Sequence, residues 1–336
     1  MTMTPVCRRV HVRVPATSAN LGSGFDTVGL ALDYHDDLDF TLSDDPSDSS
    51  VRVIIHGEGE DSLPRDETHL VVSAFRQACR TFGLGHPGLV LEAWNRIPQA
   101  RGMGSSAEAI VAGIAAAAAL LHQGEIPRQT VFDMAAVVEG HPDNVAPAVF
   151  GGLTVSWDMA VDEGVGSVPI AGGEPLQPGF HTITYPVADD VLASVFIPDY
   201  ELSTQKARQA LPERLPYRDA VYDVSRVGLM PGALDPRNVS GGSTVDPNAL
   251  LFAATQDRMH QPYRRGLMKP SWNLIEDLRE RGFAAAVSGA GPCVLVLHHG
   301  DARADVEAVA GEKLSSGHWR VLHLPVSSHG VEVERR

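Results

Sequence analysis

A glycine- and serine-rich loop runs directly into a long alanine-rich segment, and this junction constrains the fold more than any other feature of the chain. The loop reads Pro98-Gln-Ala-Arg-Gly-Met-Gly-Ser-Ser-Ala107, and a helix predicted from about Ser106 follows it. Gly102 and Gly104 allow backbone angles that are closed to other residues and let the main chain approach a ligand closely. The free amides and the dipole of the first helical turn then favour a bound phosphate.

The same residues also fit a plain capped helix after a tight turn. Ser105 can cap the helix, and Glu108, three residues later, completes the Ser-x-x-Glu pattern of a capping box. A Walker loop is excluded because no lysine follows the second glycine, and a serine hydrolase is disfavoured because neither serine lies in a Gly-x-Ser-x-Gly elbow. The local sequence leaves the phosphate loop and the capped turn open.

Composition narrows the class of protein. A chain of 336 residues exceeds the usual size of a single core, so two domains that share a cleft are expected. The net charge of −15 argues against nucleic acid or an anionic membrane as a partner. The three cysteines are widely spaced, which is typical of reduced thiols. The N-terminus lacks the apolar core of a signal peptide and the longest apolar run is too short to span a bilayer, so we expect a cytoplasmic protein.

Periodicity and turn residues give a coarse map of the elements. The patterns predict strands at 9–14, 50–55, 90–94, 151–157, 191–197, 284–288 and 293–298. They predict helices at 68–82, 106–124, 130–139, 217–229, 250–263 and 271–281. The stretch that ends near residue 178 is rich in glycine and proline and reads as a domain junction. We therefore expect domains at 1–170 and 171–336, each of mixed α+β composition.

Two further glycine-serine clusters lie at residues 16–29 and 287–292. Together with the central loop they resemble, in order, the three motifs of the kinase superfamily named after galactokinase, homoserine kinase, mevalonate kinase and phosphomevalonate kinase. Met103 stands where the family has leucine, a swap of similar volume. Residues 17–26 and 139–146 resemble the homoserine kinase branch in particular. The sugar signature of a galactokinase, Gly-Glu-His-x-Asp-Tyr, does not occur near the N-terminus.

This resemblance covers nearly the whole chain and implies both fold and activity. The implied fold is α+β, with an N-terminal ATP-binding domain like domain 2 of ribosomal protein S5 and a ferredoxin-like C-terminal domain. The implied reaction is ATP-dependent phosphorylation of the side-chain hydroxyl of L-homoserine to O-phospho-L-homoserine, on the route to threonine. ATP and homoserine are the implied partners, and a homodimer stays open.

Phosphoryl transfer depends on positioning and charge neutralisation more than on covalent help. By resemblance, Mg²⁺ is held by Ser106 and Glu139, with Asp133 as a fallback because some relatives place more residues after the glutamate. The plain alternative for Glu139 is a solvated glutamate at a helix end. His69 occupies a place where relatives often carry asparagine near the adenine. The resemblance implies an ATP site formed by Pro98, Arg101, Gly102, Met103, Gly104, Ser105, Ser106 and His69.

The acceptor's carboxylate is best gripped by arginine forks. Arg208 and Arg264 match the positions that homoserine kinases use for this group, although each alone reads as a solvated helix arginine. Asn20 and Asp26 could also be simple turn residues. By resemblance, the amino end and the chain of the acceptor are held by Asn20, Asp26, Asn144 and Thr204.

A dedicated base on the acceptor hydroxyl is not expected. Mevalonate kinases carry aspartate where the resemblance places Asn144, and an amide cannot accept a proton in the same way. Asp143 would point elsewhere if its segment is extended, and His141 is expected to be structural. We therefore expect Asn144, Arg208 and Arg264 to act by alignment and electrostatics. The rivals are the same fold acting on another small alcohol, such as mevalonate or threonine, and a catalytically silent sensor.

Overall fold

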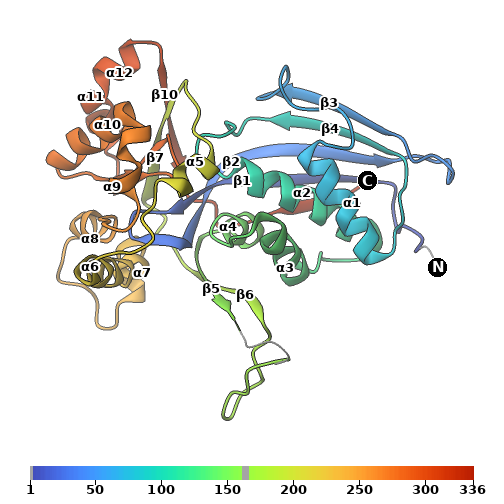
Figure 1. The fold of residues 1–336 in the computed structure, drawn as a ribbon, viewed down its shortest axis with the longest axis horizontal. Coiled ribbons are helices and arrows are strands. Elements are labelled where there is room, and N and C mark those ends of the chain that lie inside the picture. The colour runs from blue at the N-terminus through green and yellow to red at the C-terminus, as the bar shows by residue number, and fades with distance from the viewer. Residues whose placement is uncertain (1–2, 161–165) are drawn as a thin grey trace.

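The computed structural model describes residues 3–160 and 166–336, and its elements are built around two β-sheets (Figure 1). The first sheet has the order β11-β1-β2-β4-β3, and β5 and β6 extend it from β2. Its strands are β1 (Arg9–Asn20), β2 (Gly24–Leu42), β3 (Val51–Gly57), β4 (Leu89–Asn95), β5 (Leu153–Met159), β6 (Gly179–Tyr185) and β11 (Glu332–Arg335). The helices that pack with this sheet are α1 (Leu70–Phe82), α2 (Ser105–Leu121), α3 (Arg128–Glu139) and α4 (Val145–Phe150).

The second sheet is antiparallel and has the order β10-β7-β9-β8. Its strands are β7 (Val191–Pro198), β8 (Ala284–Val287), β9 (Val294–His299) and β10 (Trp319–Pro325). The helices in this part of the chain are α5 (Thr204–Gln209), α6 (Tyr217–Val227), α7 (Met230–Leu234), α8 (Pro247–Ala254), α9 (Gln261–Arg264), α10 (Lys269–Glu280), α11 (Arg303–Val309) and α12 (Gly311–Ser315). Short 3₁₀ turns occupy η1 (Pro236–Asn238) and η2 (Arg265–Leu267). No helix of the described residues has the length and apolarity needed to cross a membrane.

The two sheets divide the chain at a different place from the expected boundary at residue 170. Strand β6 pairs with β5 in the first sheet, with Leu153 opposite Tyr185, so this sheet continues to Tyr185. The last strand, β11, returns from the far end of the chain and pairs with β1. The glycine- and proline-rich stretch therefore connects two strands of one sheet. Residues 161–165 of that predicted junction lie outside the described residues.

Helix α2 lies in the centre of the first domain because its small side chains let neighbouring elements approach closely. Nearly all of its residues from Ala107 to Leu120 are buried. Opposite α1 the contact is so close that a Cβ added at Gly113 would lie 2.4 Å from the carbonyl oxygen of Val71. An alanine-rich helix loses little side-chain entropy on burial, so this packing fixes the axis of α2 and its N-terminus at low cost.

The start of α2 differs from the predicted capping box. Gly104, with φ of 76°, occupies the N-cap position, and no side chain caps the helix. Ser105 is therefore the first helical residue, one place too late to act as a cap. Glu108 is 5% exposed and its Oε1 atom has no hydrogen-bond partner. The left-handed glycine thus leaves the amides of the first helical turn free of side-chain oxygens.

The first motif lies at the turn between two long strands. Sequence patterns predicted a strand only at 9–14, whereas β1 runs to Asn20 and pairs along its length with β2, which the patterns missed. Asn20, Leu21 and Asp26 adopt positive φ values of 71°, 45° and 57°. Asparagine and aspartate tolerate this region better than most residues. Asn20 at the end of β1 and Asp26 near the start of β2 thus flank the turn, and both line the cavity described below.

The predicted helix at 250–263 is two helices. Helix α8 ends at Ala254 and α9 begins at Gln261. Between them, the side chain of Asp257 accepts hydrogen bonds from the backbone amides of Met259, His260 and Gln261. A side-chain acceptor for these amides offers the backbone an alternative to a continuous helix. The break places Arg264 at the end of α9, close to the first motif.

Candidate active site

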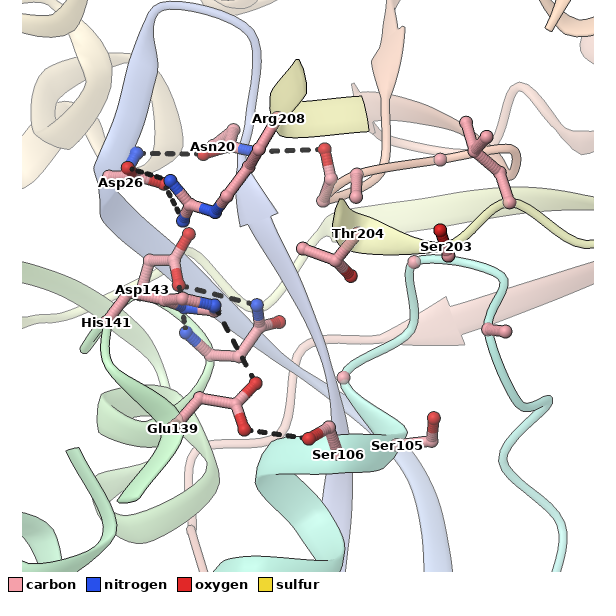
Figure 2. Close-up of a pocket in the computed structure, with 18 of the residues that line it drawn as sticks. Asn20, Asp26, Ser105, Ser106, Glu139, His141, Asp143, Ser203, Thr204 and Arg208 are labelled. Atoms are coloured by element: carbon pink, nitrogen blue, oxygen red, sulfur yellow. Dashed lines mark hydrogen bonds and ion pairs between the residues drawn. The ribbon is translucent and has the colours of Figure 1, made fainter. Parts of the chain in front are cut away.

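A cavity of about 330 Å³ lies where the three glycine-serine motifs meet (Figure 2). It draws residues from the β1–β2 turn, the loop before α2, the α3–α4 connection, α5, α9 and the turn after β8. Its lining residues are Asn20, Asp26, Ala100, Gly102, Gly104, Ser105, Ser106, Glu139, His141, Asp143, Asn144, Leu202, Ser203, Thr204, Arg208, Arg264, Gly289, Ala290 and Gly291.

The two glycines of the central loop have no room for a side chain. A Cβ at Gly104 would lie 1.9 Å from Oγ1 of Thr17, and one at Gly102 would lie 2.1 Å from the carbonyl oxygen of Ser288. Both glycines also have positive φ values, 85° at Gly102 and 76° at Gly104. The loop is therefore packed against the first and third motifs through its backbone.

Side-chain hydrogen bonds tie the three motifs into one unit. The hydroxyls of Ser18 and Ser288 lie 2.9 Å apart, and Ser288 also donates to the carbonyl oxygen of Gly102 at 2.6 Å. The Asn20 side-chain amide donates to the carbonyl oxygen of Gly289 at 2.9 Å. The Ser18–Ser288 and Asn20–Gly289 bonds are buried, where a lost partner costs most, and the Ser288–Gly102 bond is partly buried. Segments that lie far apart in the sequence thus form one rigid wall of the cavity.

Ser106 and Glu139, the two residues expected to hold Mg²⁺, meet at the end of the cavity beside the loop before α2. The Ser106 hydroxyl donates to Oε2 of Glu139 at 2.7 Å, as Figure 2 shows. Burial is the main effect on the Glu139 carboxyl and raises its pKa above the ordinary value. A carboxylate that is 12% exposed and next to a hydroxyl fits a hard cation such as Mg²⁺. The described residues contain no group of three or more His, Cys, Asp or Glu side chains placed to hold a metal.

The fallback ligand, Asp133, does not reach the cavity. Its carboxylate accepts a hydrogen bond from Gln129 on the same helix, and it is absent from the cavity lining. Asp133 and Glu139 are six residues apart on α3, which turns their side chains to different faces of the helix. Of the two carboxylates, only Glu139 is placed beside the loop.

Arg208 and Asp26 form a two-pronged ion pair at the other end of the cavity. Both guanidinium NH groups donate to the two carboxylate oxygens at 2.9 Å. The hydrogen bonds to Asp26 are the main reason that the pKa of Arg208 is raised. Both side chains are about one third exposed, so a ligand that enters the cavity can reach them. The expected substrate residues Arg208 and Asp26 are thus paired with each other.

Arg264 differs from Arg208 because it is buried without an acidic partner. It is 2% exposed, and no carboxylate of the described residues lies within 4.0 Å of its guanidinium group. Its hydrogen-bond partners are neutral: the carbonyl oxygens of Ala207 and Gly289 and the ring of His260. Burial lowers its pKa from the usual value. Asp26, Asp257 and Asp143 act on Arg264 only through longer-range charge. A buried cation with no carboxylate in contact is costly, which favours an anionic ligand at this place.

The connection between α3 and α4 contributes a hydrogen-bonded cluster that faces the cavity. Asp143 accepts hydrogen bonds from the ring of His141 at 2.7 Å and from the backbone amide of Asn144 at 2.9 Å. The expectation that Asp143 would point elsewhere is wrong, because its segment forms a turn instead of an extended strand. Burial lowers and the Asp143 contact raises the pKa of His141, and the net direction is upward. The Asn144 side chain accepts from Thr17 at 2.8 Å.

Four residues of the expected ATP site lie outside the cavity lining: Pro98, Arg101, Met103 and His69. Met103 is fully buried in the core between the domains. Arg101 donates to the carbonyl oxygens of Gln99, Pro198 and Asp199, so it fastens the loop to the end of β7. His69 precedes α1, and both of its ring nitrogens are buried without a hydrogen-bond partner. Of these four side chains, Arg101 supports the loop through its hydrogen bonds.

Sequence reasoning missed several residues that line the cavity. The third motif was recognised as a glycine-serine cluster, but Gly289, Ala290 and Gly291 were not assigned a role. Ser203 precedes the expected Thr204 and accepts the backbone amide of Lys206 as the N-cap of α5. Its signal was present, because serine before a helical stretch is a common cap. Thr204 itself lines the cavity as expected.

Comparison with known proteins agrees with this geometry. Residues 69–152 match the family model "GHMP kinases N terminal domain", and residues 242–315 match "GHMP kinases C terminal". A homoserine kinase of Clavibacter michiganensis is 43% identical over 97% of this chain and 94% of its own length. A homoserine kinase of Leifsonia xyli is 42% identical over 98% of this chain and 93% of its own length.

A solved structure supports the same fold. The homoserine kinase of Cytophaga hutchinsonii superposes with a TM-score of 0.78 at 24% identity, over 99% of this chain and 100% of that one. The expected two-domain small-molecule kinase fold is therefore confirmed. The motifs, the cavity that they share and the full-length similarity lead to one conclusion: the chain is an enzyme of the GHMP kinase superfamily and belongs to its homoserine kinase family.

Proposed function

We propose that this enzyme transfers the γ-phosphoryl group of ATP to the side-chain hydroxyl of L-homoserine and so forms O-phospho-L-homoserine for threonine synthesis, as a cytoplasmic enzyme. The observation that carries the proposal is the buried Arg264 without an acidic partner, in the same cavity as the phosphate loop. The active site of a homoserine kinase must bind the carboxylate of the acceptor at one end and the triphosphate of ATP at the other. The cavity offers one cationic end and one amide-rich end.

The phosphate end is formed by Gly102, Gly104, Ser105 and Ser106. The free amides at the start of α2 and the helix dipole favour the negative charge of the nucleotide. The chain has a net charge of −15, so local amides and cations must supply the positive potential that ATP needs. The loop geometry does this without a lysine.

Ser106 and Glu139 are the residues that would hold Mg²⁺. When bound, Mg²⁺ neutralises phosphate charge that develops during transfer. Glu139 supplies a carboxylate whose raised pKa reflects burial, and Ser106 supplies a hydroxyl oxygen 2.7 Å away. A divalent cation held by both side chains would offset the cost of burying the negative charge of Glu139.

The acceptor end is formed by Arg264 and Arg208 with the first motif. Arg264 would bind the substrate carboxylate, and Asp26 would share its charge between Arg208 and the substrate ammonium. Asn20, Asn144 and Thr204 line the path between the two ends. This set orients the hydroxyl toward the γ-phosphate, and positioning of this kind can supply a large part of the rate.

The test is an ADP-release assay with a panel of hydroxyl-bearing acceptors. We expect L-homoserine to give the highest kcat/KM, and mevalonate and galactose to give background rates. Removal of divalent cations with EDTA should abolish turnover, and added Mg²⁺ should restore it. Comparable kcat/KM for mevalonate would overturn the proposed substrate, and no turnover of any acceptor would favour a sensor.

A further inference from the structure

His260 lies directly behind Arg264 and connects it to the first motif. Its ring is completely buried. Nδ1 lies 3.2 Å from a guanidinium nitrogen of Arg264, and Nε2 lies 2.7 Å from the carbonyl oxygen of Gly22 in the β1–β2 turn. The histidine therefore bridges a residue of α9 and the turn that carries Asn20 and Asp26.

The partners of the ring determine its tautomer. A guanidinium group can only donate, so Nδ1 must accept the hydrogen bond from Arg264. On the opposite side, Nε2 faces two acceptors, the carbonyl oxygen of Gly22 and a carboxylate oxygen of Asp257 at 3.6 Å. The proton must therefore reside on Nε2. Because Nδ1 accepts from a cation, the ring has to stay neutral.

The surrounding charges favour the neutral ring. Burial is the largest effect and lowers the pKa of His260. Arg264 lowers this pKa further, while Asp257, the Gly22 carbonyl oxygen and Asp26 raise it without reversing the direction. A second proton would lie on Nδ1 and point at the guanidinium group. The neutral tautomer is thus compatible with the cation beside it.

The ring of Phe25 contacts His260 and both arginines. Its ring stacks on His260 with centroids 4.9 Å apart and an angle of 25° between the planes. The guanidinium carbon of Arg264 lies 5.2 Å from the centroid of the same ring, and that of Arg208 lies 5.9 Å away. These distances are within the range of cation–π attraction. One aromatic residue of the first motif therefore contacts all three side chains.

We propose that His260 is a positioning residue for substrate recognition: its neutral Nε2–H tautomer holds the guanidinium group of Arg264 toward the cavity. The proposal rests on the proposed function, in which Arg264 binds the acceptor carboxylate. Arg264 needs neutral acceptors behind it, because an acidic partner would compete with the substrate. His260 supplies such an acceptor, and its bond to Gly22 ties the arginine to the loop of Asn20 and Asp26.

Two substitutions of His260 distinguish the effect of its hydrogen-bond acceptor from the effect of its aromatic ring. His260→Phe keeps an aromatic ring against Phe25 but removes both nitrogens. His260→Asn can keep an acceptor near the position of Nδ1. We expect H260F to raise KM for homoserine at least about tenfold, since a hydrogen bond to a charged group is lost. KM for ATP and kcat should change less than threefold, and H260N should recover part of the loss.

His298→Phe serves as a control, because His298 is another buried histidine of the second domain and contacts Ser194 and Gly300 away from the cavity. Its KM for homoserine should equal that of the unmodified enzyme. In a double-mutant cycle, H260F should add little to Arg264→Leu, because both changes remove the same interaction. Equal rises in KM for ATP and homoserine, additive effects, or no rise in H260F would overturn the proposal.

An NMR measurement without substrate tests the tautomer of His260 independently of the proposed function. Long-range ¹H–¹⁵N NMR of the histidine-labelled enzyme, with H260N to assign the signal, should show a ring protonated only at Nε2 at neutral pH. A doubly protonated ring, or a proton on Nδ1, overturns the inference even if H260F fails to fold. If the tautomer is as expected but homoserine is not phosphorylated, the proposed function fails and the role of His260 toward a homoserine carboxylate fails with it.

Discussion

Arg208 donates two parallel hydrogen bonds to the carboxylate of Asp26, each 2.9 Å long, while the neighbouring Arg264 has no carboxylate within 4.0 Å among the described residues. The two arginines line the same cavity, but their guanidinium groups differ in how far they are already paired. Arg208 is neutralised before a substrate arrives. Arg264 keeps its charge available, held by neutral acceptors.

This difference predicts unequal effects of removing the two arginines. Arg264→Leu should raise KM for homoserine by about 30-fold or more, because loss of one partner of a buried charge pair costs roughly 2 to 5 kcal/mol. Arg208→Leu should raise KM less, since the Arg208–Asp26 pair is about one third exposed and screened by solvent. Steady-state kinetics with varied homoserine will show this. Larger effects at Arg208 than at Arg264 would contradict the assignment of the carboxylate site.

The placement of Glu139 beside the phosphate loop predicts that it supports the metal. Glu139→Gln should lose most of kcat while weak ATP binding persists, because several kcal/mol of charge stabilisation depends on a correctly held cation. Asp133→Asn is the matched control on the same helix and should be nearly normal, since Asp133 contacts Gln129 outside the cavity. Isothermal titration with ATP at varied Mg²⁺ and initial rates will test both variants. An inactive Asp133→Asn together with an active Glu139→Gln would reverse the assignment.

The packing of Gly104 predicts that even one methyl group is not tolerated there. Gly104→Ala places a Cβ 1.9 Å from Oγ1 of Thr17 and at a positive φ, so it should move the loop and weaken ATP binding strongly. Gly124→Ala has a similar φ of 85° but open space around the added atom. It should cost only about 1 kcal/mol of stability. Equal loss of ATP affinity in the two variants would show that conformational strain, not the contact with Thr17, is responsible.

The cluster of His141, Asp143 and Asn144 allows a test of base catalysis. If alignment and electrostatics activate the hydroxyl, Asp143→Asn should keep kcat within about tenfold, because its carboxylate serves to hold His141 and the Asn144 amide. A base would instead be revealed by a fall in kcat of about 10² to 10⁴ with little change in KM. An acidic limb in the pH profile of kcat that disappears in Asp143→Asn would identify Asp143 as that base. The same measurements on Asp26→Asn cover the other candidate.

Glu108 predicts a pH-dependent loss of stability. Burial, and then the charge of Asp36, raise the pKa of Glu108 well above its usual value, and the pKa of Asp36 is itself raised to about 6, mainly by burial. A carboxyl with a higher pKa in the folded than in the unfolded protein stabilises the fold below the unfolded pKa. This contribution is lost as the pH rises toward the folded pKa.

Replacement of Glu108 by an apolar residue should therefore increase the stability of the fold most at high pH. Glu108→Met, of similar length, should raise Tm by several degrees at pH 8 and by less at pH 5, because an unpaired buried polar group costs about 1–3 kcal/mol. Glu280→Met, at an exposed glutamate near the end of α10, should leave Tm unchanged. Thermal unfolding across this pH range will decide. A Tm for Glu108→Met that is lowered equally at every pH would mean that the carboxylate has a partner.

The sequence determined the elements that local chemistry specifies. The alanine-rich run predicted a buried helix, and α2 is buried from Ala107 to Leu120. Whether a side chain caps its N-terminus was left open by the sequence. Gly102 and Gly104 were expected to adopt backbone angles closed to other residues, and both have positive φ values. The three motifs and their order were sufficient to predict the family by resemblance.

Only the tertiary structure decided which side chains meet. Local patterns gave no sign that β11 would return to β1, or that β6 would continue the first sheet past residue 170, because strand pairing is set by long-range contacts. They also gave no sign that Asp26 would pair with Arg208, or that no carboxylate of the described residues would lie within 4.0 Å of Arg264. The sequence gives the charge of a side chain. Its ion-pair partner and its burial depend on which distant segments pack around it. For this reason His260, which resembles any helix-end histidine in the sequence, became the neutral acceptor behind Arg264 only once α9 packed against the β1–β2 turn.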